Sequence, residues 1–259
     1  MPDGGIEGRL RQAIRRPGGV GAFWFALGSL GLLEVALAAK PEAVVLDMQH
    51  GLFSRESLEG AVGSARHVAP TLVRVADATP IAIGQALDAG ADGILVPLVE
   101  SATEAASVVR AAHFPPRGAR SGGGVRPLAQ GFASYVAAAA GTVAGVMIET
   151  AAGVEAAEAI AATPGLDLVF IGTGDLALSL GCFPEIDARH EAACKRVLKA
   201  CRSAGVPCGI FTVTAAEAAR RQDEGYALTV VANDIGVAAA GFATAQTLFE
   251  RPGNGASTR

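Results

Sequence analysis

The sequence predicts a single (β/α)8 barrel, the TIM-barrel architecture of the α/β class. Eight short apolar runs recur along the 259 residues, and a helical pattern follows each of them. The runs are apolar throughout, as in parallel strands that are covered on both faces. An open doubly wound sheet is the alternative, but no GxGxxG motif joins the first run to its helix. The barrel therefore fits the pattern best.

Short apolar runs define the strands, and capping motifs define some of the helices between them. Ser101-Ala-Thr-Glu104 and Thr214-Ala-Ala-Glu217 are capping boxes that begin two helices. Cys194 and Cys201 lie on another helical pattern, which favours buried thiols over metal or redox chemistry. In chain order, the strands are expected at residues 19–27, 43–47, 71–75, 93–97, 145–149, 167–172, 206–211 and 228–232.

The segment at residues 117–142 is too long for an ordinary loop between a strand and a helix. We expect a glycine-rich turn at Ser121-Gly-Gly-Gly124 and an accessory helix around residues 132–140. No linker rich in proline, glycine and serine divides the chain. The expected organisation is one barrel domain at residues 1–251 and a flexible C-terminal tail at residues 252–259.

Composition excludes several kinds of protein. Hydrophobic residues make up 51% of the chain and charged residues 18%, which argues against disordered, fibrous and coiled-coil proteins. The net charge of −4 argues against nucleic acid or an anionic membrane as the main partner. The N-terminal segment lacks the apolar region of a signal peptide, and no uncharged run approaches the ~20 residues of a membrane span. A cytoplasmic protein is expected.

In a (β/α)8 barrel the chemistry lies at the C-terminal ends of the strands. The second predicted strand ends in Asp47 and leads to His50, and the third carries Arg74 near its end. The fifth ends in Glu149, and Asp175 lies just beyond the sixth. These five charged or titratable side chains are therefore expected to meet on one rim of the barrel.

Glu149 and Asp175 are the candidate metal ligands. Two carboxylates at neighbouring strand ends repel each other unless a cation lies between them. Because no cysteine or histidine accompanies them, the expected ion is a hard divalent one, Mg²⁺ or Mn²⁺, with Co²⁺ as a further candidate. The alternative is that the two acids separately cap the helices that follow them.

His50 is the candidate acid–base group, since it is the only histidine at a predicted strand end. His67 and His113 lie at predicted helix ends, and His190 lies in a helix start that looks exposed. Asp47 is expected either to orient His50 or to bind a water on the metal.

Arg74 lies inside a strand, where a guanidinium needs an anionic partner. It is expected either to hold a substrate carboxylate or developing enolate, or to form a structural bridge to Asp47 or Asp92. Asp88, near the end of the helix after the third strand, is either solvated or paired with an imidazole, whose basicity it would raise.

A metal, a guanidinium and an imidazole together suit enolate chemistry at a 2-oxo acid. The metal would polarise the keto oxygen, Arg74 would stabilise the oxyanion and His50 would move the proton. Schiff-base chemistry is the rival route. It is disfavoured because none of the three lysines, Lys40, Lys195 and Lys199, lies at a C-terminal strand end.

Several ordered motifs resemble the HpcH/HpaI aldolase/citrate lyase family, and within it the class II (metal-dependent) pyruvate aldolases. The resemblance covers about residues 18–249. It implies a divalent-metal-dependent aldolase that reversibly cleaves a 4-hydroxy-2-oxo acid to pyruvate or a related 2-oxo acid and an aldehyde. It also implies a hexamer, built as a trimer of dimers with an exchanged terminal helix. The motifs are LDMQHG, VRV, QALDAGADGILVPLVES, FPPRGAR, MIET and VFIGTGDLALSLG.

The resemblance also implies roles for individual residues. Glu149 and Asp175 match the metal ligands, His50 the acid–base histidine and Arg74 the arginine that stabilises the enolate. Asp88 matches a carboxylate that raises the basicity of the histidine, contributed from the same chain or a neighbouring one. The remaining matches are Asp47 near the metal waters, and Met147, Gly172, Thr173 and Gly174 at the substrate-binding positions.

The chain departs from the family pattern at several places. Gln49 stands where the family often has glutamate, which removes a charge, and Met147 replaces a substrate-binding glutamine, which removes a hydrogen bond. Gly174 stands for the commoner alanine, and the turn at residues 121–124 differs. These differences leave the choice of substrate open.

Three other functions remain as alternatives. A malyl- or citramalyl-CoA-type lyase would need a basic surface, for which Arg117, Arg120 and Arg126 are the only cluster found. A biosynthetic carbon–carbon bond-forming enzyme would use the same enolate. A barrel that binds a metal and an oxo acid without turnover is the third, with Gln49 and Met147 as its support.

Overall fold

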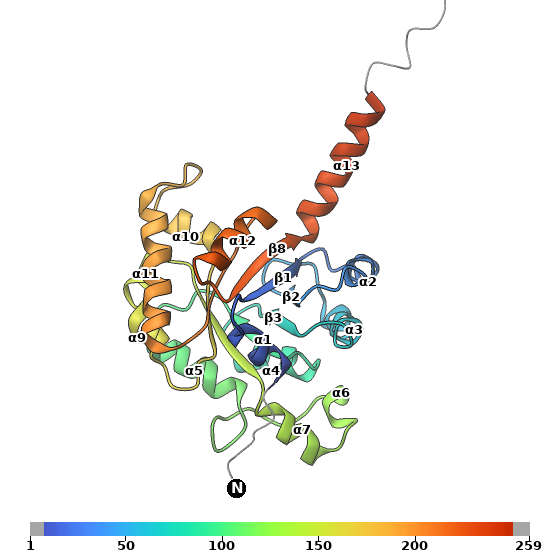
Figure 1. Cartoon of the computed structure of the whole chain (residues 1–259). Helices are drawn as coiled ribbons and strands as arrows, with labels where there is room; N and C mark the ends of the chain where they lie inside the picture. The colour runs from blue at the N-terminus through green and yellow to red at the C-terminus, as the bar shows by residue number, and fades with distance from the viewer. Residues whose placement is uncertain (1–7, 251–259) are drawn as a thin grey trace, which may run out of the picture.

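The computed structural model describes residues 8–250, and within this range eight parallel strands form one closed barrel (Figure 1). The strands are β1 (Val20–Phe25), β2 (Ala43–Asp47), β3 (Thr71–Arg74), β4 (Gly93–Val96), β5 (Val143–Ile148), β6 (Leu168–Ile171), β7 (Cys208–Ile210) and β8 (Leu228–Asn233). Each strand pairs with the next in the chain, and β8 closes the ring against β1. The predicted (β/α)8 fold is confirmed. The predicted tail at residues 252–259 lies outside the described residues.

Helices follow the strands around the outside of the barrel. The described helices are α1 (Arg9–Arg15), α2 (Leu30–Leu37), α3 (Arg55–Ala65), α4 (Pro80–Asp88), α5 (Ala102–Ala112), α6 (Val125–Leu128), α7 (Phe132–Ala139), α8 (Ala151–Glu155), α9 (Ala157–Ala161), α10 (Thr173–Ser179), α11 (Ala188–Ala204), α12 (Ala215–Asp223) and α13 (Asp234–Glu250). The accessory helix expected around residues 132–140 is confirmed as α7, and the short helix α6 precedes it.

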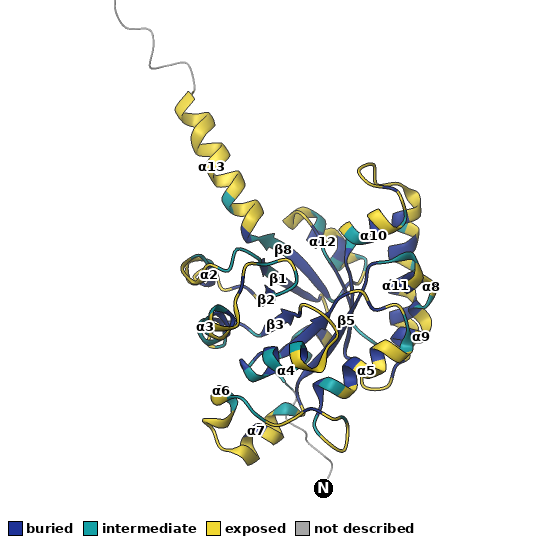
Figure 2. Ribbon diagram, turned by 180° about the vertical axis from the view of Figure 1, so that it is seen from behind, coloured by how far each residue is buried: buried dark blue, intermediate teal, exposed yellow. Residues whose placement is uncertain are grey.

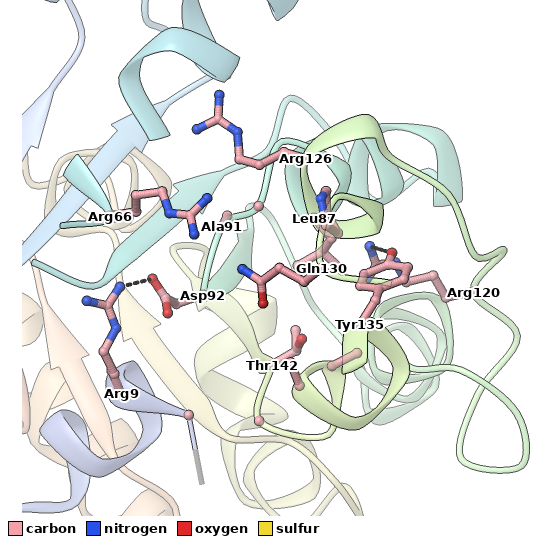
Figure 3. A pocket seen from close by; sticks show the side chains of 16 residues that line it. Arg9, Arg66, Leu87, Ala91, Asp92, Arg120, Arg126, Gln130, Tyr135 and Thr142 are labelled. Carbon is pink, nitrogen blue, oxygen red and sulfur yellow. Dashed lines mark hydrogen bonds and ion pairs between the residues drawn. The ribbon is translucent and has the colours of Figure 1, made fainter. Parts of the chain in front are cut away.

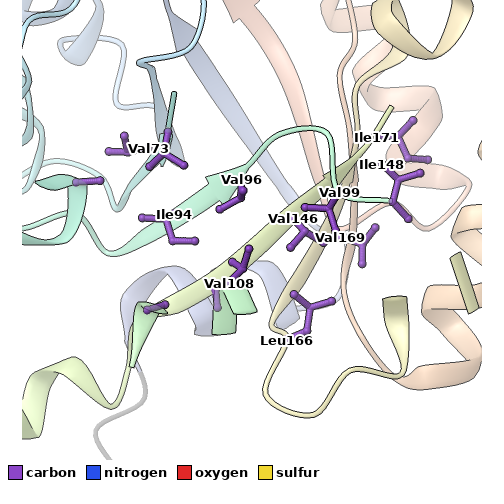
Figure 4. Close-up of a cluster of buried hydrophobic side chains, with 14 of the residues drawn as sticks. Val73, Ile94, Val96, Val99, Val108, Val146, Ile148, Leu166, Val169 and Ile171 are labelled. Atoms are coloured by element: carbon purple, nitrogen blue, oxygen red, sulfur yellow. The ribbon is translucent and has the colours of Figure 1, made fainter. Parts of the chain in front are cut away.

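The hydrophobic core has two layers, because strand residues alternate between the barrel interior and the surrounding helices. Val45 and Leu72 pack inside the barrel with Phe170. Val44 and Val73 pack outward against the helices, and Figure 4 shows part of this outer layer. Both faces of the strands are buried, which is why the strand segments are apolar throughout.

Helix α1 closes the N-terminal end of the barrel. Leu10 and Ile14 are fully buried and join the interior cluster. On the other side of α1, the Arg11 guanidinium lies 2.9 Å from the Asp167 carboxylate and 2.7 Å from the Thr142 carbonyl oxygen. The interior is thus sealed at one end, and only the opposite rim is open to chemistry.

The two predicted capping boxes have different outcomes. Ser101 and Glu104 cap each other's backbone N–H groups at the start of α5, as predicted. At α12, the Thr214 hydroxyl accepts the Glu217 N–H, but the Glu217 carboxylate accepts from Val213, one residue before the cap. The predicted start of α12 is therefore confirmed, but only one of the two hydrogen bonds of a capping box is present.

The prediction that His190 is exposed is wrong. The imidazole is buried instead of exposed, because its Nε2 lies 3.0 Å from the Thr173 carbonyl oxygen and α11 packs against the barrel. The four cysteines are free and buried, as expected for structural thiols, which are Cys182, Cys194, Cys201 and Cys208.

Helix α13 leaves the barrel at the end of β8 and extends away from it (Figure 1). Asp234 is buried at its start and accepts hydrogen bonds from the N–H groups of Ala26 and Leu27, which fixes the base of the helix to the end of β1. Most of the helix beyond that point is exposed, as Figure 2 shows. Among residues 8–250, no helix combines the length and apolarity that crossing a membrane requires.

Candidate active site

Asp47 and Arg74 form a buried ion pair at the C-terminal ends of β2 and β3, where the strand register places them side by side. Arg74 Nε donates to Asp47 Oδ1 at 2.9 Å, and Nη2 donates to Oδ2. The structural bridge from Arg74 to Asp47 is therefore present. Asp92 instead accepts from Thr71 and Arg9 at the other end of the barrel.

Trp24, from β1, completes this arrangement. Its indole N–H donates to Asp47 Oδ2 at 3.3 Å, and the Arg74 guanidinium carbon lies 5.0 Å from the centroid of its ring. Arg74 is thus held by a carboxylate and by an aromatic face. Its Nη1 has no hydrogen-bond partner within residues 8–250, so one donor edge is left for a ligand.

The loop after β2 wraps around the same carboxylate. The backbone N–H groups of Gln49 and His50 donate to Asp47 Oδ1 at 3.0 and 3.2 Å. Burial would raise the pKa of Asp47, but the hydrogen bond and charge of Arg74, helped by these N–H groups, lower it below its ordinary value. Asp47 therefore remains ionised and fixes the position of His50, whose side chain is exposed.

Glu149 follows β5 and is 1% exposed. Its Oε1 accepts the Leu98 N–H at 2.8 Å, whereas its Oε2 is buried without a partner among the described residues. Burial raises the pKa of Glu149, and the negative charge of Asp175 adds to this, against the Leu98 N–H and Arg74. A buried carboxylate oxygen without a donor is costly, so it marks a place for a cation.

The helix-capping alternative does not hold for either acid. Thr150, not Glu149, caps α8 with its side chain. Gly172 is the N-cap of α10, and Asp175 lies half-buried in its first turn. The two carboxylates are therefore free for another role.

Gly172 provides the space in which the Glu149 side chain lies. A Cβ atom at this position would lie 2.2 Å from Glu149 Oε2 and 3.1 Å from the end of the Met147 side chain. The family resemblance implies Gly172 at the site but does not give this reason for a glycine there.

The remaining predicted substrate-binding positions surround Gly172. Met147 is buried beside Phe170 and Trp24 in the barrel interior. The Thr173 hydroxyl donates to the Phe211 carbonyl oxygen at 3.3 Å. Since α10 begins at Thr173, the N–H groups of Thr173 and Gly174 have no partner within the helix.

Asp88 is not brought to this rim within one chain. It ends α4, shortly before β4 begins, and thus lies at the N-terminal end of the barrel. Its carboxylate pairs with Arg120 Nη2 at 3.0 Å. Pairing between Asp88 and His50 would need a second copy of the chain.

Two features of the site were not predicted. Trp24 is apolar in the sequence pattern, and only its indole N–H inside a buried strand hints at a polar partner. Leu98 has φ of +57°, which is unusual for a residue other than glycine. This conformation accompanies the hydrogen bond from its N–H to Glu149, and no sequence pattern indicates it.

The donor set fits a hard divalent cation. Glu149 and Asp175 offer carboxylate oxygens only, and Glu149 Oε2 has no partner among residues 8–250. Within residues 8–250, no group of three or more His, Cys, Asp and Glu side chains is arranged to hold a metal. Further ligands would therefore come from water and substrate, as Mg²⁺ and Mn²⁺ allow.

Comparison with known proteins gives one consistent answer. The HpcH/HpaI aldolase/citrate lyase family model matches residues 22–240. A hydroxypyruvate/pyruvate aldolase from Paraburkholderia phytofirmans is 33% identical over 239 residues, which cover 87% of this chain and 91% of that protein. A 4-hydroxy-2-oxovalerate aldolase from Rhodococcus jostii is 40% identical over 199 residues, covering 73% and 76%. A solved HpcH/HpaI family protein from Burkholderia cenocepacia has a TM-score of 0.87 at 32% identity, covering 93% of this chain and 99% of that one.

Proposed function

Because the chain belongs to the HpcH/HpaI aldolase/citrate lyase family, it is a carbon–carbon lyase, and we propose that it cleaves a 4-hydroxy-2-oxo acid to pyruvate or hydroxypyruvate and an aldehyde. The reaction is reversible and depends on a divalent metal, as in the family's class II aldolases. The observation that carries the proposal is the buried Glu149 carboxylate near the Asp47–Arg74 pair, whose Oε2 lacks a partner in the described part of the chain.

We assign Glu149 and Asp175 as the residues that hold the metal, with Mg²⁺ or Mn²⁺ as the proposed ion. When bound, such an ion supplies Lewis-acid polarisation of the keto group of a 2-oxo acid. The two charged oxygens need this cation, because burial and mutual repulsion disfavour two adjacent carboxylates.

The protein's own groups supply the rest of the mechanism. The free Nη1 of Arg74 stabilises negative charge that develops on the keto oxygen, and Asp47 and Trp24 keep Arg74 in place. The N–H groups of Thr173 and Gly174 bind the substrate carboxylate. His50 takes the proton of the substrate's 4-hydroxyl group as the C3–C4 bond breaks and returns a proton to C3 of the enolate, which gives pyruvate. The exposure of His50 lets solvent exchange that proton.

We propose that the chain assembles as a hexamer, a trimer of dimers in which α13 is exchanged. The helix carries exposed apolar side chains that its own barrel does not cover, at Val237, Phe242 and Phe249. Assembly also offers a route by which Asp88 of a second copy reaches His50. The cytoplasmic location remains a prediction from the sequence.

The malyl- or citramalyl-CoA alternative gains no support. In the structure Arg120 pairs with Asp88 at the N-terminal end of the barrel, and Arg126 donates to the Glu59 carbonyl oxygen at 2.7 Å. This cluster therefore lies away from the rim that carries Glu149.

Proton exchange tests the proposal directly. Pyruvate and Mg²⁺ in D2O are expected to lose the methyl proton signal in the presence of the protein, because the proposed enolate forms reversibly. Glu149→Gln and Asp175→Asn should each lower the exchange rate by about 100-fold or more, since each removes a charged oxygen ligand. EDTA should abolish exchange. His50→Ala should slow exchange by about 10²–10⁴-fold while changing pyruvate affinity little.

Asp223→Asn is the matched control, because Asp223 is exposed at the end of α12, far from the rim. It should exchange pyruvate protons at the unchanged rate. Exchange that survives EDTA, or that both carboxylate variants retain, would contradict the proposal. Pyruvate binding without exchange would identify the non-catalytic barrel instead.

A further inference from the structure

A cavity of about 220 Å³ lies at the N-terminal end of the barrel, opposite the candidate active site (Figure 3). Gly90 and Asp92 line it just before β4 begins, and Thr142 lines it just before β5. The segment that carries α6 and α7 forms its other wall. It is therefore separate from the rim where Glu149 lies.

Four arginines line this cavity, Arg9, Arg66, Arg120 and Arg126, and we call it the arginine cavity. Asp92 is the only acidic residue among the described residues that line it. Arg9 lies 3.4 Å from Asp92, and Arg120 lies 3.0 Å from Asp88. Neither Arg66 nor Arg126 pairs with a carboxylate within residues 8–250, so the described residues give the cavity and its ion pairs an excess of two positive charges.

Donors in the arginine cavity are left without partners. The half-buried Arg66 side chain has no hydrogen bond or ion pair within the described part of the chain. Figure 3 shows its guanidinium and the Gln130 amide reaching into the cavity from opposite sides. Arg120 is 7% exposed, and its Nε is buried with no partner among the described residues. Buried donors of this kind require an acceptor.

Arg126 is held in place by its surroundings. A Cβ atom at Gly63 would lie 2.4 Å from Arg126 Nη1, and one at Gly90 would lie 3.2 Å from its Cδ. The guanidinium also donates to the Glu59 carbonyl oxygen at 2.7 Å. Two glycines thus make room for this side chain, and its charge is fixed beside the cavity before any ligand arrives.

We propose that the arginine cavity binds a small doubly charged anion, inorganic phosphate or the phosphoryl group of a small ester. A phosphate monoester carries a charge of about −1.5 to −2 at pH 7, which matches the two unpaired guanidinium groups. Pyruvate carries one negative charge and is less well matched. A bound phosphate would contact Arg66 at the C-terminal end of α3, the turn before β4 and the α6–α7 segment, and would hold that segment against the barrel.

Calorimetric titration of the full chain with inorganic phosphate tests this proposal. Saturating Mg²⁺ and pyruvate are present, so that phosphate does not report on the rim. The expected result is saturable binding of one phosphate per chain. Arg66→Gln and Arg126→Gln should each weaken it by tenfold or more. Both variants should keep the pyruvate exchange rate within twofold, because neither residue lies at the rim.

Arg15→Gln is the control, since Arg15 is exposed at the same end of the barrel but outside the cavity. It should leave phosphate affinity within twofold of the unmodified chain. Absence of saturable binding, or equal weakening by Arg66→Gln and Arg15→Gln, would overturn the proposal. Tighter binding of malonate than of phosphate would overturn the phosphoryl assignment.

Discussion

At the scale of single residues, the candidate site depends on the surroundings of the two oxygens of the Glu149 carboxylate. One carboxylate oxygen accepts the Leu98 N–H, and Gly172 leaves room for the other. Holding Leu98 at a positive φ costs of order 1–2 kcal/mol, which the surrounding structure must offset. Such strain is typical of positions where function constrains the backbone.

Gly172→Ala is expected to abolish activity while the barrel stays folded. Its Cβ would lie 2.2 Å from Glu149 Oε2, so the carboxylate must move away from the position proposed for the metal. We expect at least about a 100-fold loss of pyruvate proton exchange, the same as for removing the ligand. Circular dichroism checks the fold.

Gly31→Ala is the matched control, because a Cβ there meets no atom within 4 Å. It should keep both the fold and the exchange rate. Full activity of Gly172→Ala would show that Glu149 does not need this space.

The buried imidazole of His113 is expected to make the free energy of unfolding depend on pH. It is 3% exposed, and burial, aided by the Arg117 charge, lowers its pKa from 6.5 to about 4. Between these two values the unfolded chain binds a proton that the folded chain does not. The free energy of unfolding should therefore be highest above pH 6.5 and fall by up to about 3 kcal/mol as the pH drops toward 4.

Urea unfolding at several pH values measures this effect. His113→Gln should remove that part of the pH dependence, because the amide does not titrate. His67→Gln should retain it, since His67 is exposed. Identical pH profiles for the unmodified chain and His113→Gln would rule out the assignment.

At the scale of elements, continuous apolar runs predict the strands of the barrel well, because each strand is buried on both faces. Predicted strands at 43–47 and 228–232 begin where β2 and β8 begin. The strand predicted at 145–149 begins two residues earlier, at Val143, since the preceding Thr-Val-Ala reads equally as the end of α7. The predicted strand at 206–211 is longer than β7, because apolar residues flank the strand on both sides: Val206 packs against the outer cluster and Phe211 against the interior cluster.

The sequence predicts which residues lie at the site, but it does not predict which residues they contact. Strand ends identify Asp47, Arg74 and Glu149, because parallel strands end on one rim. The Trp24 contact requires the indole of β1 to reach Asp47 on the neighbouring strand β2, which the apolar pattern does not indicate. The predicted exposure of His190 is wrong because the buried face of a helix depends on its packing. Which end of the barrel receives Asp88 follows from helix direction, but its partner Arg120 comes from a segment without a regular pattern.

Helix α1 makes a separate contribution to stability, because it seals the barrel interior. Leu10→Ala is expected to lower the free energy of unfolding by about 2–5 kcal/mol, since Leu10 is fully buried and its loss leaves a cavity. Urea unfolding measures the change.

Val35→Ala on α2, where the side chain is 72% exposed, is the control and should cost no more than about 0.5 kcal/mol. An equally small effect of Leu10→Ala would mean that α1 does not stabilise the barrel.

At the scale of the whole molecule, the two ends of the barrel have different roles. The C-terminal rim carries the carboxylates and Arg74, whereas the N-terminal end is closed by α1 and carries the arginine cavity. Within one chain, the proposed phosphate site therefore does not compete with substrate, and coupling between the two sites would pass through the strands. Within one chain, Asp88 lies at this N-terminal end. Asp88 can act on His50 only if two chains assemble so that the N-terminal end of one barrel meets the C-terminal rim of the other.

Helix α13 gives the prediction that tests this assembly. Phe242 and Phe249 are 78% and 82% exposed, and the helix packs mainly at its start, against β1 and β8. Burying a phenylalanine side chain is worth about 1.5–3 kcal/mol, so two such residues left in water favour a partner surface.

The double variant Phe242→Ser, Phe249→Ser is expected to lower the mass measured by light scattering. Phe183→Ser, which changes a 63% exposed residue in the loop between α10 and α11, is expected to leave that mass unchanged. If the double variant keeps the mass of the unmodified chain, α13 does not hold the assembly together, and the proposed exchange of this helix is wrong.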